Sequence, residues 1–212
     1  MKEWGDKMPD KIFNGLDSEK QERILDAALK EFAEYGFDNG STNRIVKECG
    51  ISKGSLFKYF ENKEELYFYL IDIVSARMVE ETKVEVSKMS EDLYERVIEY
   101  SVAEISWYIS NPVMGRFLIG VASETGSEIG RKIMERYGAK STDIYEELLK
   151  GVDMSEFHND RKEISDILRW VLMGYNSSFL ENNRGCGDDI DKLKKKYMKE
   201  LKLHLKVLKN GF

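Results

Sequence analysis

Apolar residues recur at helical spacing along most of this 212-residue chain. Between residues 18 and 35, Ile24, Ala28 and Phe32 fall four residues apart, the spacing of one buried helix face. Only 2 prolines interrupt the pattern, so we predict an all-α protein. The pattern predicts about nine helices, over residues 18–35, 42–49, 53–60, 63–88, 92–110, 113–122, 125–150, 160–182 and 188–209.

The second and third of these helices are short and are separated by a tight turn. Gly50 is suited to the positive φ that ends the first helix, and Ser52 is a natural N-cap for the next. Leu56 and Phe60 form the buried stripe of that next helix. Two short helices joined by a turn with Gly are typical of a DNA-reading helix-turn-helix. Asn62 should then cap the long helix that follows.

This stretch resembles the TetR family of bacterial one-component repressors, from KQERILDAALKEFAEYGF (residues 20–37) through ISKGSLFKYFENKEELY (residues 51–67). The resemblance implies an N-terminal three-helix DNA-binding domain in residues 1–62, of which residues 1–16 are expected to be a mobile arm. It also implies a larger C-terminal helical domain, residues 63–212, that binds an effector and dimerises.

The start of the second short helix is expected to enter the major groove of double-stranded DNA, where side chains contact bases. From their positions we predict base contacts by Lys53, Gly54, Ser55 and Lys58. The resemblance adds a base contact by Asn43 and phosphate contacts by Thr42, Tyr59 and Lys63. Phe57 stands where many relatives carry a phosphate-bonding tyrosine, so that contact is in doubt here.

Charge agrees with a local DNA interface. The whole chain has a net charge of −6, which does not suit a general binder of polyanions. Within residues 41–60, however, Arg44, Lys47, Lys53 and Lys58 face only Glu48, giving 4 − 1 = +3.

The last two predicted helices resemble the family's dimerisation helices. Their apolar faces are formed by Ile164, Ile167, Leu168 and Val171 and by Leu193, Tyr197, Leu201 and Leu205. We expect a homodimer, because one helix-turn-helix needs a second copy for tight, specific binding. The alternative is that both faces cover their own domain.

The resemblance also implies an effector pocket in the C-terminal domain, with release from DNA when a small molecule binds. Candidate lining residues are Tyr100, Trp107, Tyr108, Phe117, Trp170, Tyr175 and Phe179, with Glu104, Glu124 and Asn176 as polar anchors. Aromatic rings with a carboxylate would suit a lipophilic cation, whereas the rings alone would suit an acyl chain or an aromatic compound. Both remain open.

Other chemistries find less support. Residues 50–54 match the G-x-S-x-G elbow of serine hydrolases, but no strand precedes them and the chain has only 2 histidines, so we expect no enzyme and no cofactor. An acidic loop could be interpreted as a metal site, but it lacks ligand spacing and we expect no metal there; it contains Asp153, Glu156, His158 and Asp160. A dimer controlled by a protein partner remains the main alternative, with a small helical enzyme behind it.

The compartment is expected to be the cytoplasm. Cys49 and Cys186 are far apart in the sequence and form no ligand-spaced cluster, which favours a reducing environment. The N-terminal residues lack a signal-peptide core and no apolar run approaches a membrane span, so no membrane partner is expected.

Overall fold

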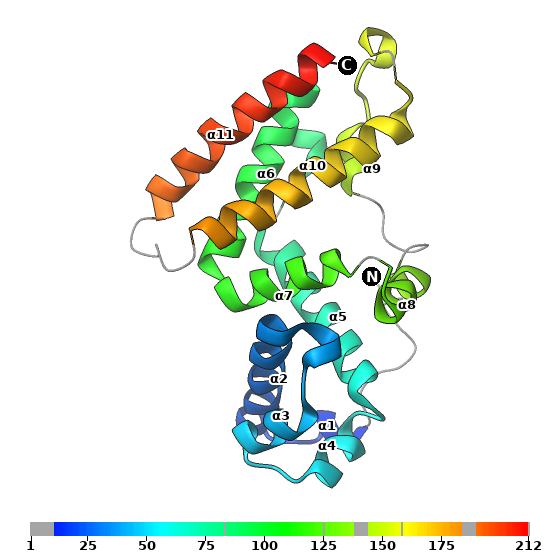
Figure 1. The fold of residues 1–212 in the computed structure, drawn as a ribbon, viewed down its shortest axis with the longest axis vertical. Helices are drawn as coiled ribbons and strands as arrows, with labels where there is room; N and C mark the ends of the chain where they lie inside the picture. The colour runs from blue at the N-terminus through cyan, green and yellow to red at the C-terminus, as the bar shows by residue number, and fades with distance from the viewer. Residues whose placement is uncertain are drawn as a thin grey trace. The chain divides into compact units, whose positions relative to one another are not determined.

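The computed structural model describes residues 11–82, 84–124, 126–137, 144–157, 159–183 and 190–211 (Figure 1). Within these ranges the chain forms α-helices and two 3-10 turns but no strand, which confirms the all-α prediction. The helices are α1 (Lys11–Asn14), α2 (Ser18–Asn39), α3 (Thr42–Cys49), α4 (Lys53–Tyr59), α5 (Lys63–Thr82), α6 (Leu93–Ser110), α7 (Pro112–Ser123), α8 (Glu128–Tyr137), α9 (Ile144–Leu148), α10 (Arg161–Asn182) and α11 (Ile190–Gly211).

The chain divides into two compact units, each with its own core. The first unit contains residues 1–80 and 112–135, and the second contains residues 81–111 and 136–212. Helices α5 and α7 therefore pack with the helix-turn-helix, and α7 lies along α2.

Helix α2 supplies the buried face predicted for the first unit, since Ile24, Ala28 and Phe32 are all buried. Its N-cap is Asp17, which accepts from the Lys20 amide, and Ser18 is the first residue of the helix. The helix also continues past the predicted end at residue 35, with a kink at Gly36, where φ is +68°. The kink lets helical turns resume up to Asn39, so the sequence pattern placed the end too early.

The expected mobile arm is wrong for its second half, because residues 11–14 form α1 and Phe13 is fully buried. The Phe13 ring lies 4.9 Å from the Phe60 ring and 5.9 Å from the rings of Tyr59 and Tyr69. It thus packs on Tyr59, Phe60 and Tyr69, at the end of α4 and in α5. Residues 1–10 lie outside the described ranges.

Three other predicted helices differ in length or burial. Helix α5 ends at Thr82, short of residue 88. Helix α7 extends one residue beyond the predicted range at each end, and Gly115 and Phe117 are its buried residues. The segment predicted as one helix over 125–150 contains α8, capped by Ser127, and the separate short helix α9. Residue 125 lies outside the described ranges.

The second unit is built on α6, α10 and α11. Asp92 caps α6, and Asp160 caps α10 in a capping box. The buried face of α11 contacts α6. Arg96, itself buried, donates to the carbonyl oxygens of Leu148 (2.9 Å) and Lys150 (2.6 Å), which ties the end of α9 to α6. In the described part of the chain, no helix combines the length and apolar character needed to cross a bilayer.

Candidate nucleic-acid interface

The helix-turn-helix is formed as predicted. Ser41 caps α3, which ends at Gly50 with φ +68° and ψ 33°, the left-handed conformation that glycine adopts without strain. Ser52 caps α4, its hydroxyl accepting from the Ser55 amide at 3.0 Å. Leu56 and Phe60 are buried, so the inner face of α4 is fixed by packing. Asn62 accepts from the Glu65 amide at 2.9 Å and caps α5.

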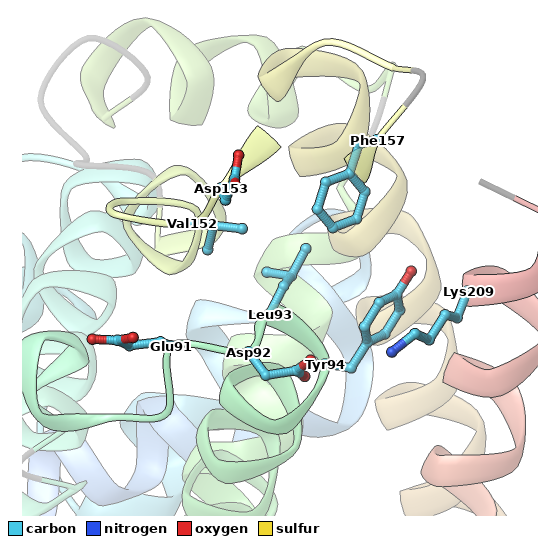
Figure 2. A pocket seen from close by; sticks show the side chains of 8 residues that line it. All are labelled: Glu91, Asp92, Leu93, Tyr94, Val152, Asp153, Phe157 and Lys209. Atoms are coloured by element: carbon cyan, nitrogen blue, oxygen red, sulfur yellow. The ribbon is translucent and has the colours of Figure 1, made fainter. Parts of the chain in front are cut away.

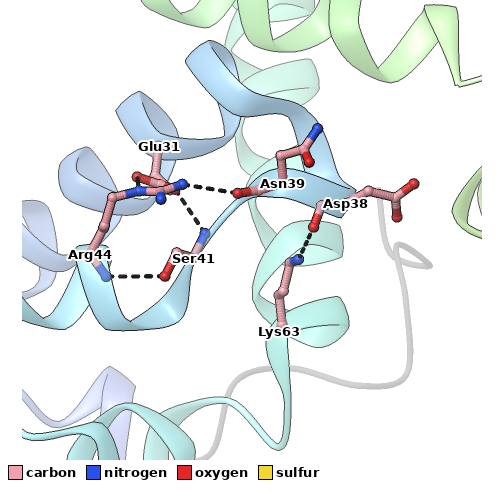
Figure 3. Close-up of polar contacts among 6 residues, drawn as sticks. All are labelled: Glu31, Asp38, Asn39, Ser41, Arg44 and Lys63. Carbon is pink, nitrogen blue, oxygen red and sulfur yellow. Dashed lines mark hydrogen bonds and ion pairs between the residues drawn. The ribbon is translucent and has the colours of Figure 1, made fainter.

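A buried carboxylate on α2 holds the start of α3 in place (Figure 3). Glu31 accepts from the Ser41 amide at 2.8 Å and from Nε of Arg44 at 2.9 Å. The Arg44 guanidinium also donates to the Asn39 carbonyl at 2.9 Å and lies 4.3 Å from the centre of the Tyr35 ring. The hydrogen bond with Glu31 raises the pKa of Arg44 further above its ordinary value. We call Glu31, Ser41 and Arg44 the α2–α3 clamp.

The clamp changes the charge balance of the interface. Arg44 is exposed but paired with Glu31, which compensates its charge. The other exposed cations of the stretch are Lys47, Lys53 and Lys58 against exposed Glu48, or 3 − 1 = +2. The clamp was not visible in the sequence, because it pairs side chains 13 residues apart on two helices. A buried polar position in the amphipathic pattern of α2 was the one signal of it.

Most residues predicted to contact bases share the solvent-facing side of the motif. Asn43, Lys53, Gly54 and Lys58 are exposed. Ser55 is half-buried, and its hydroxyl lies 2.9 Å from that of Ser52, which makes it part of the cap as well.

The residues predicted to contact phosphate differ among themselves. Thr42 and Lys63 are half-buried. The Lys63 ammonium donates to the Asp38 carbonyl at 3.2 Å (Figure 3) and lies 4.5 Å from the centre of the Phe37 ring. Partial burial lowers the pKa of Lys63. Tyr59 is only 7% exposed and packs on Phe13, so its ring is a core residue rather than the predicted surface contact.

The residues predicted for the effector pocket are divided between the two units. Phe117 and Glu124 belong to the first unit, where the Phe117 ring lies 5.3 Å from that of Tyr67 and Glu124 accepts from the Ser127 hydroxyl. Trp170 is 68% exposed on α10. The exposure of Trp170 contradicts its predicted place in a pocket lining, whereas the pocket roles of Phe117 and Glu124 stay predictions.

Helices α6 and α10 do bring several of the others together around Glu104. This buried carboxylate accepts from the hydroxyls of Tyr108 (3.0 Å) and Tyr100 (3.5 Å) and from the Asn176 amide (2.8 Å). Tyr197 of α11 donates to the Asn176 side-chain oxygen. Burial raises the pKa of Glu104, and the three hydrogen bonds oppose that rise. We call Tyr100, Glu104, Tyr108, Asn176 and Tyr197 the Glu104 network.

Trp107, Tyr175 and Phe179 surround this network without bonding to Glu104. The Trp107 indole donates to Glu81 at 2.8 Å, and the Tyr175 hydroxyl donates to Glu200 at 3.0 Å. The Phe179 ring is buried, 5.1 Å from the Tyr197 ring. The polar anchors are therefore satisfied by the chain itself.

A cavity of about 210 Å³ lies elsewhere in the second unit (Figure 2), at the start of α6. Figure 2 shows the rings of Tyr94 and Phe157 on one side, with Glu91 directed away from them. The Lys209 ammonium lies 4.7 Å from the centre of the Tyr94 ring. None of the residues predicted for the effector pocket lines this cavity.

In the acidic loop, two carboxylates serve as helix caps. Asp153 accepts from the Ser155 amide, which lowers its pKa, and Asp160 accepts from the Glu163 amide. Within the described residues, no group of three His, Cys, Asp or Glu side chains has metal-binding geometry. His158, Cys186 and the side chain of Glu156 lie outside the described part of the chain.

The predicted dimer faces mostly point into their own unit. Five of the eight residues are buried within the single chain, namely Ile164, Leu168, Tyr197, Leu201 and Leu205, and the others are half-buried. An amphipathic stripe shows that a helix face is buried, but it does not show which element buries it. Here α6 packs against the apolar face of α11. The large apolar side chains that remain exposed on α10 and α11 are Trp170, Leu203 and Val207.

The segment that contains the helix-turn-helix is similar in sequence to known transcriptional regulators. The family described as bacterial regulatory proteins, tetR family, matches residues 24–70. An HTH-type transcriptional regulator of Staphylococcus aureus (strain bovine RF122 / ET3-1) is 47% identical over 53 residues, which are 25% of this chain and 29% of that protein. The sequence match to this relative thus spans less than a third of its length.

Two solved structures extend the similarity of fold to nearly the whole chain. A TetR family transcriptional regulator from Chloroflexus aurantiacus J-10-FL has a TM-score of 0.71 at 20% identity, covering 97% of this chain and 98% of that one. The transcriptional regulator FadR from Bacillus subtilis, in complex with stearoyl-CoA, has a TM-score of 0.60 at 18% identity, covering 84% and 96%. The helix-turn-helix is thus similar in sequence to that of TetR family regulators over residues 24–70, and the fold of nearly the whole chain is similar to those of the two solved structures.

Proposed function

We propose that this chain is a homodimeric repressor that binds a palindromic DNA operator and leaves it when a small molecule binds the second unit. The observation that carries the DNA-binding part is the exposed face of α4. There Lys53, Gly54 and Lys58 project from a helix whose other face is buried and whose start is capped. Such a helix can enter the major groove without rearrangement of its own unit.

Base and phosphate contacts are divided between two parts of the motif. Lys53 donates to guanine O6 or N7, and Asn43 pairs with a base edge from the start of α3. Lys63 contacts a phosphate, since its ammonium has donors left beyond the one used at Asp38. Thr42, beside the clamp, contacts a phosphate as well.

Dimerisation supplies a second helix-turn-helix, which binds the other half of the operator. We assign it to the outward faces of α10 and α11, where Trp170, Leu203 and Val207 are exposed in the single chain. A large exposed aromatic residue is a frequent anchor of protein interfaces. In this proposal residues 1–62 bind DNA, residues 63–212 dimerise and bind the effector, and the protein acts in the cytoplasm.

The effector is a lipophilic small molecule. The support is the aromatic surroundings of the Glu104 network and the fold shared with FadR, whose structure holds stearoyl-CoA. Because the chain itself satisfies Glu104, an acyl chain or aromatic compound, which requires no new charge pair, fits better than a lipophilic cation.

The test is selection of binding sites from random duplex DNA, followed by affinity measurements on the enriched site. We expect a palindrome with half-sites about one helical turn apart or slightly more. Lys63→Ala should weaken binding to the operator and to random DNA by similar factors. Lys53→Ala should instead relax the preference at one base position.

Long-chain acyl-CoAs and aromatic compounds are then screened for release of the protein from the selected operator. Enrichment of no sequence at low salt would contradict the DNA-binding proposal. Equal effects of the two lysine variants on specific and random DNA would contradict the division of contacts.

A further inference from the structure

Phe57 is a large apolar side chain on the otherwise polar outer face of α4. It is 37% exposed, while the other large apolar residues of the segment, Leu56, Tyr59 and Phe60, are buried. Lys53 lies one helical turn earlier on the same face, and its ammonium lies 6.0 Å from the centre of the Phe57 ring. The two side chains therefore form an exposed pair on the face of α4 that is proposed to enter the major groove.

The chemistry of a phenyl ring limits what it can recognise on DNA. Phe57 has no hydroxyl group, so it cannot donate a hydrogen bond to a phosphate or to a base edge. The apolar group that the major groove offers is the 5-methyl of thymine, against which an aromatic side chain can pack. The neighbouring lysine suits the O6 and N7 acceptors of guanine.

We infer that Phe57 recognises a thymine through its 5-methyl group, next to the guanine recognised by Lys53. This inference rests on the proposed DNA-binding function and adds one base to it. Residues four apart on a helix are separated by about 6 Å along its axis, and base pairs are spaced about 3.4 Å apart. The thymine and the guanine should therefore lie within about two base pairs of each other in each half-site.

The test replaces each thymine of the selected operator, one position at a time in both half-sites, by deoxyuridine, which lacks the 5-methyl group. Binding is measured by fluorescence anisotropy. For the wild-type protein, one position should raise Kd about fourfold per half-site, the value expected for one buried methyl group. Uracil at the other positions should have little effect.

Variants connect the effect to Phe57. Phe57→Ala should bind more weakly and show no further loss with uracil at that position, so the two changes are coupled. Phe57→Tyr keeps the ring and should keep the uracil effect. Lys58→Ala, at an exposed neighbouring position that we also predict to contact DNA, is the matched control: it should weaken binding overall but keep the uracil effect. Thermal melting confirms that each variant is folded.

The outcomes separate this inference from the function on which it rests. If the protein binds its selected operator and no uracil substitution changes Kd, the thymine assignment is wrong and the DNA-binding function stands. The same holds if Phe57→Ala retains the full uracil effect. If no duplex sequence is enriched at all, the proposed function fails and this inference fails with it.

Discussion

At the residue scale, a substitution of Gly54 should affect the stability of the fold and the affinity for DNA in opposite directions. A Cβ built at this position would meet nothing closer than the Ser52 hydroxyl oxygen at 3.8 Å, so the fold itself has room for a methyl group. Gly54→Ala should stabilise α4 by about 0.5–1 kcal/mol, since alanine loses less backbone entropy in a helix. In the proposed complex the same methyl group would clash with DNA and weaken binding by about tenfold.

Thermal melting and operator titration of Gly54→Ala check both halves of this prediction. The control is Gly120→Ala in α7, where a Cβ likewise meets no atom within 4 Å. It should gain stability and keep its affinity for DNA. Unchanged DNA affinity of Gly54→Ala would show that α4 does not approach the bases closely at this residue.

At the element scale, the α2–α3 clamp determines where α3 begins. Glu31→Ala would remove the acceptor of the Ser41 amide and of the Arg44 guanidinium. We expect a loss of about 1–2 kcal/mol in the free energy of unfolding, at the lower end because Arg44 is partly solvated. DNA binding should also weaken, because Thr42 and Asn43 follow directly after the clamp.

Chemical denaturation and operator titration measure these effects. Glu22→Ala changes an exposed carboxylate on the same helix and serves as the control, with a stability within about 0.5 kcal/mol of wild type. A Glu31→Ala protein as stable as that control would mean that packing alone fixes α3.

The Glu104 network joins α6, α10 and α11 and should carry a pH signature. Burial raises the pKa of Glu104 in the folded chain above its ordinary value. The folded state then holds the proton more tightly than the unfolded state. The contribution of Glu104 to stability is therefore fully present below about pH 4.3, the ordinary value, and is lost as pH rises through the raised pKa.

Glu104→Gln removes this titration and keeps the shape of the side chain. Between about pH 4.3 and the raised pKa, the wild-type melting temperature should fall relative to that of the variant as pH increases. Melting curves of both proteins across this range give the comparison. Parallel pH profiles would show that Glu104 titrates equally in the folded and unfolded states.

At the scale of the whole molecule, the outward faces of α10 and α11 should decide the oligomeric state. We expect a dimer of 2 × 24.6 = 49.2 kDa. Trp170→Lys should raise the dissociation constant of the dimer by about thirtyfold, the loss typical of an interface tryptophan. Light scattering over a concentration series measures this change.

The control for Trp170→Lys is Met134→Lys in α8, where the methionine is 66% exposed against 68% for the tryptophan. This control should leave the dimer intact. A wild-type monomer at micromolar concentration, or equal weakening by both variants, would remove the assignment of the interface to α10.

The helix-turn-helix and its caps followed from the sequence by itself, because the interactions that form them are local. Gly50 ends α3, Ser52 caps α4 and Asn62 caps α5 through contacts within a few residues. Hydrophobic spacing likewise gave the extent of α6 and α10 closely. The kink at Gly36 was missed, since nothing in the spacing indicates that a helix resumes after an interruption.

The tertiary structure alone decided which side chains meet. Asn176 donates to Glu104 across 72 residues, and Glu31 holds Arg44 across two helices. It also decided that Leu201 and Leu205 are buried, that α11 packs on α6 and that Trp170 faces solvent. The physical reason is that periodicity records how strongly a helix face avoids water, whereas the choice of partner depends on how distant helices pack around a common core.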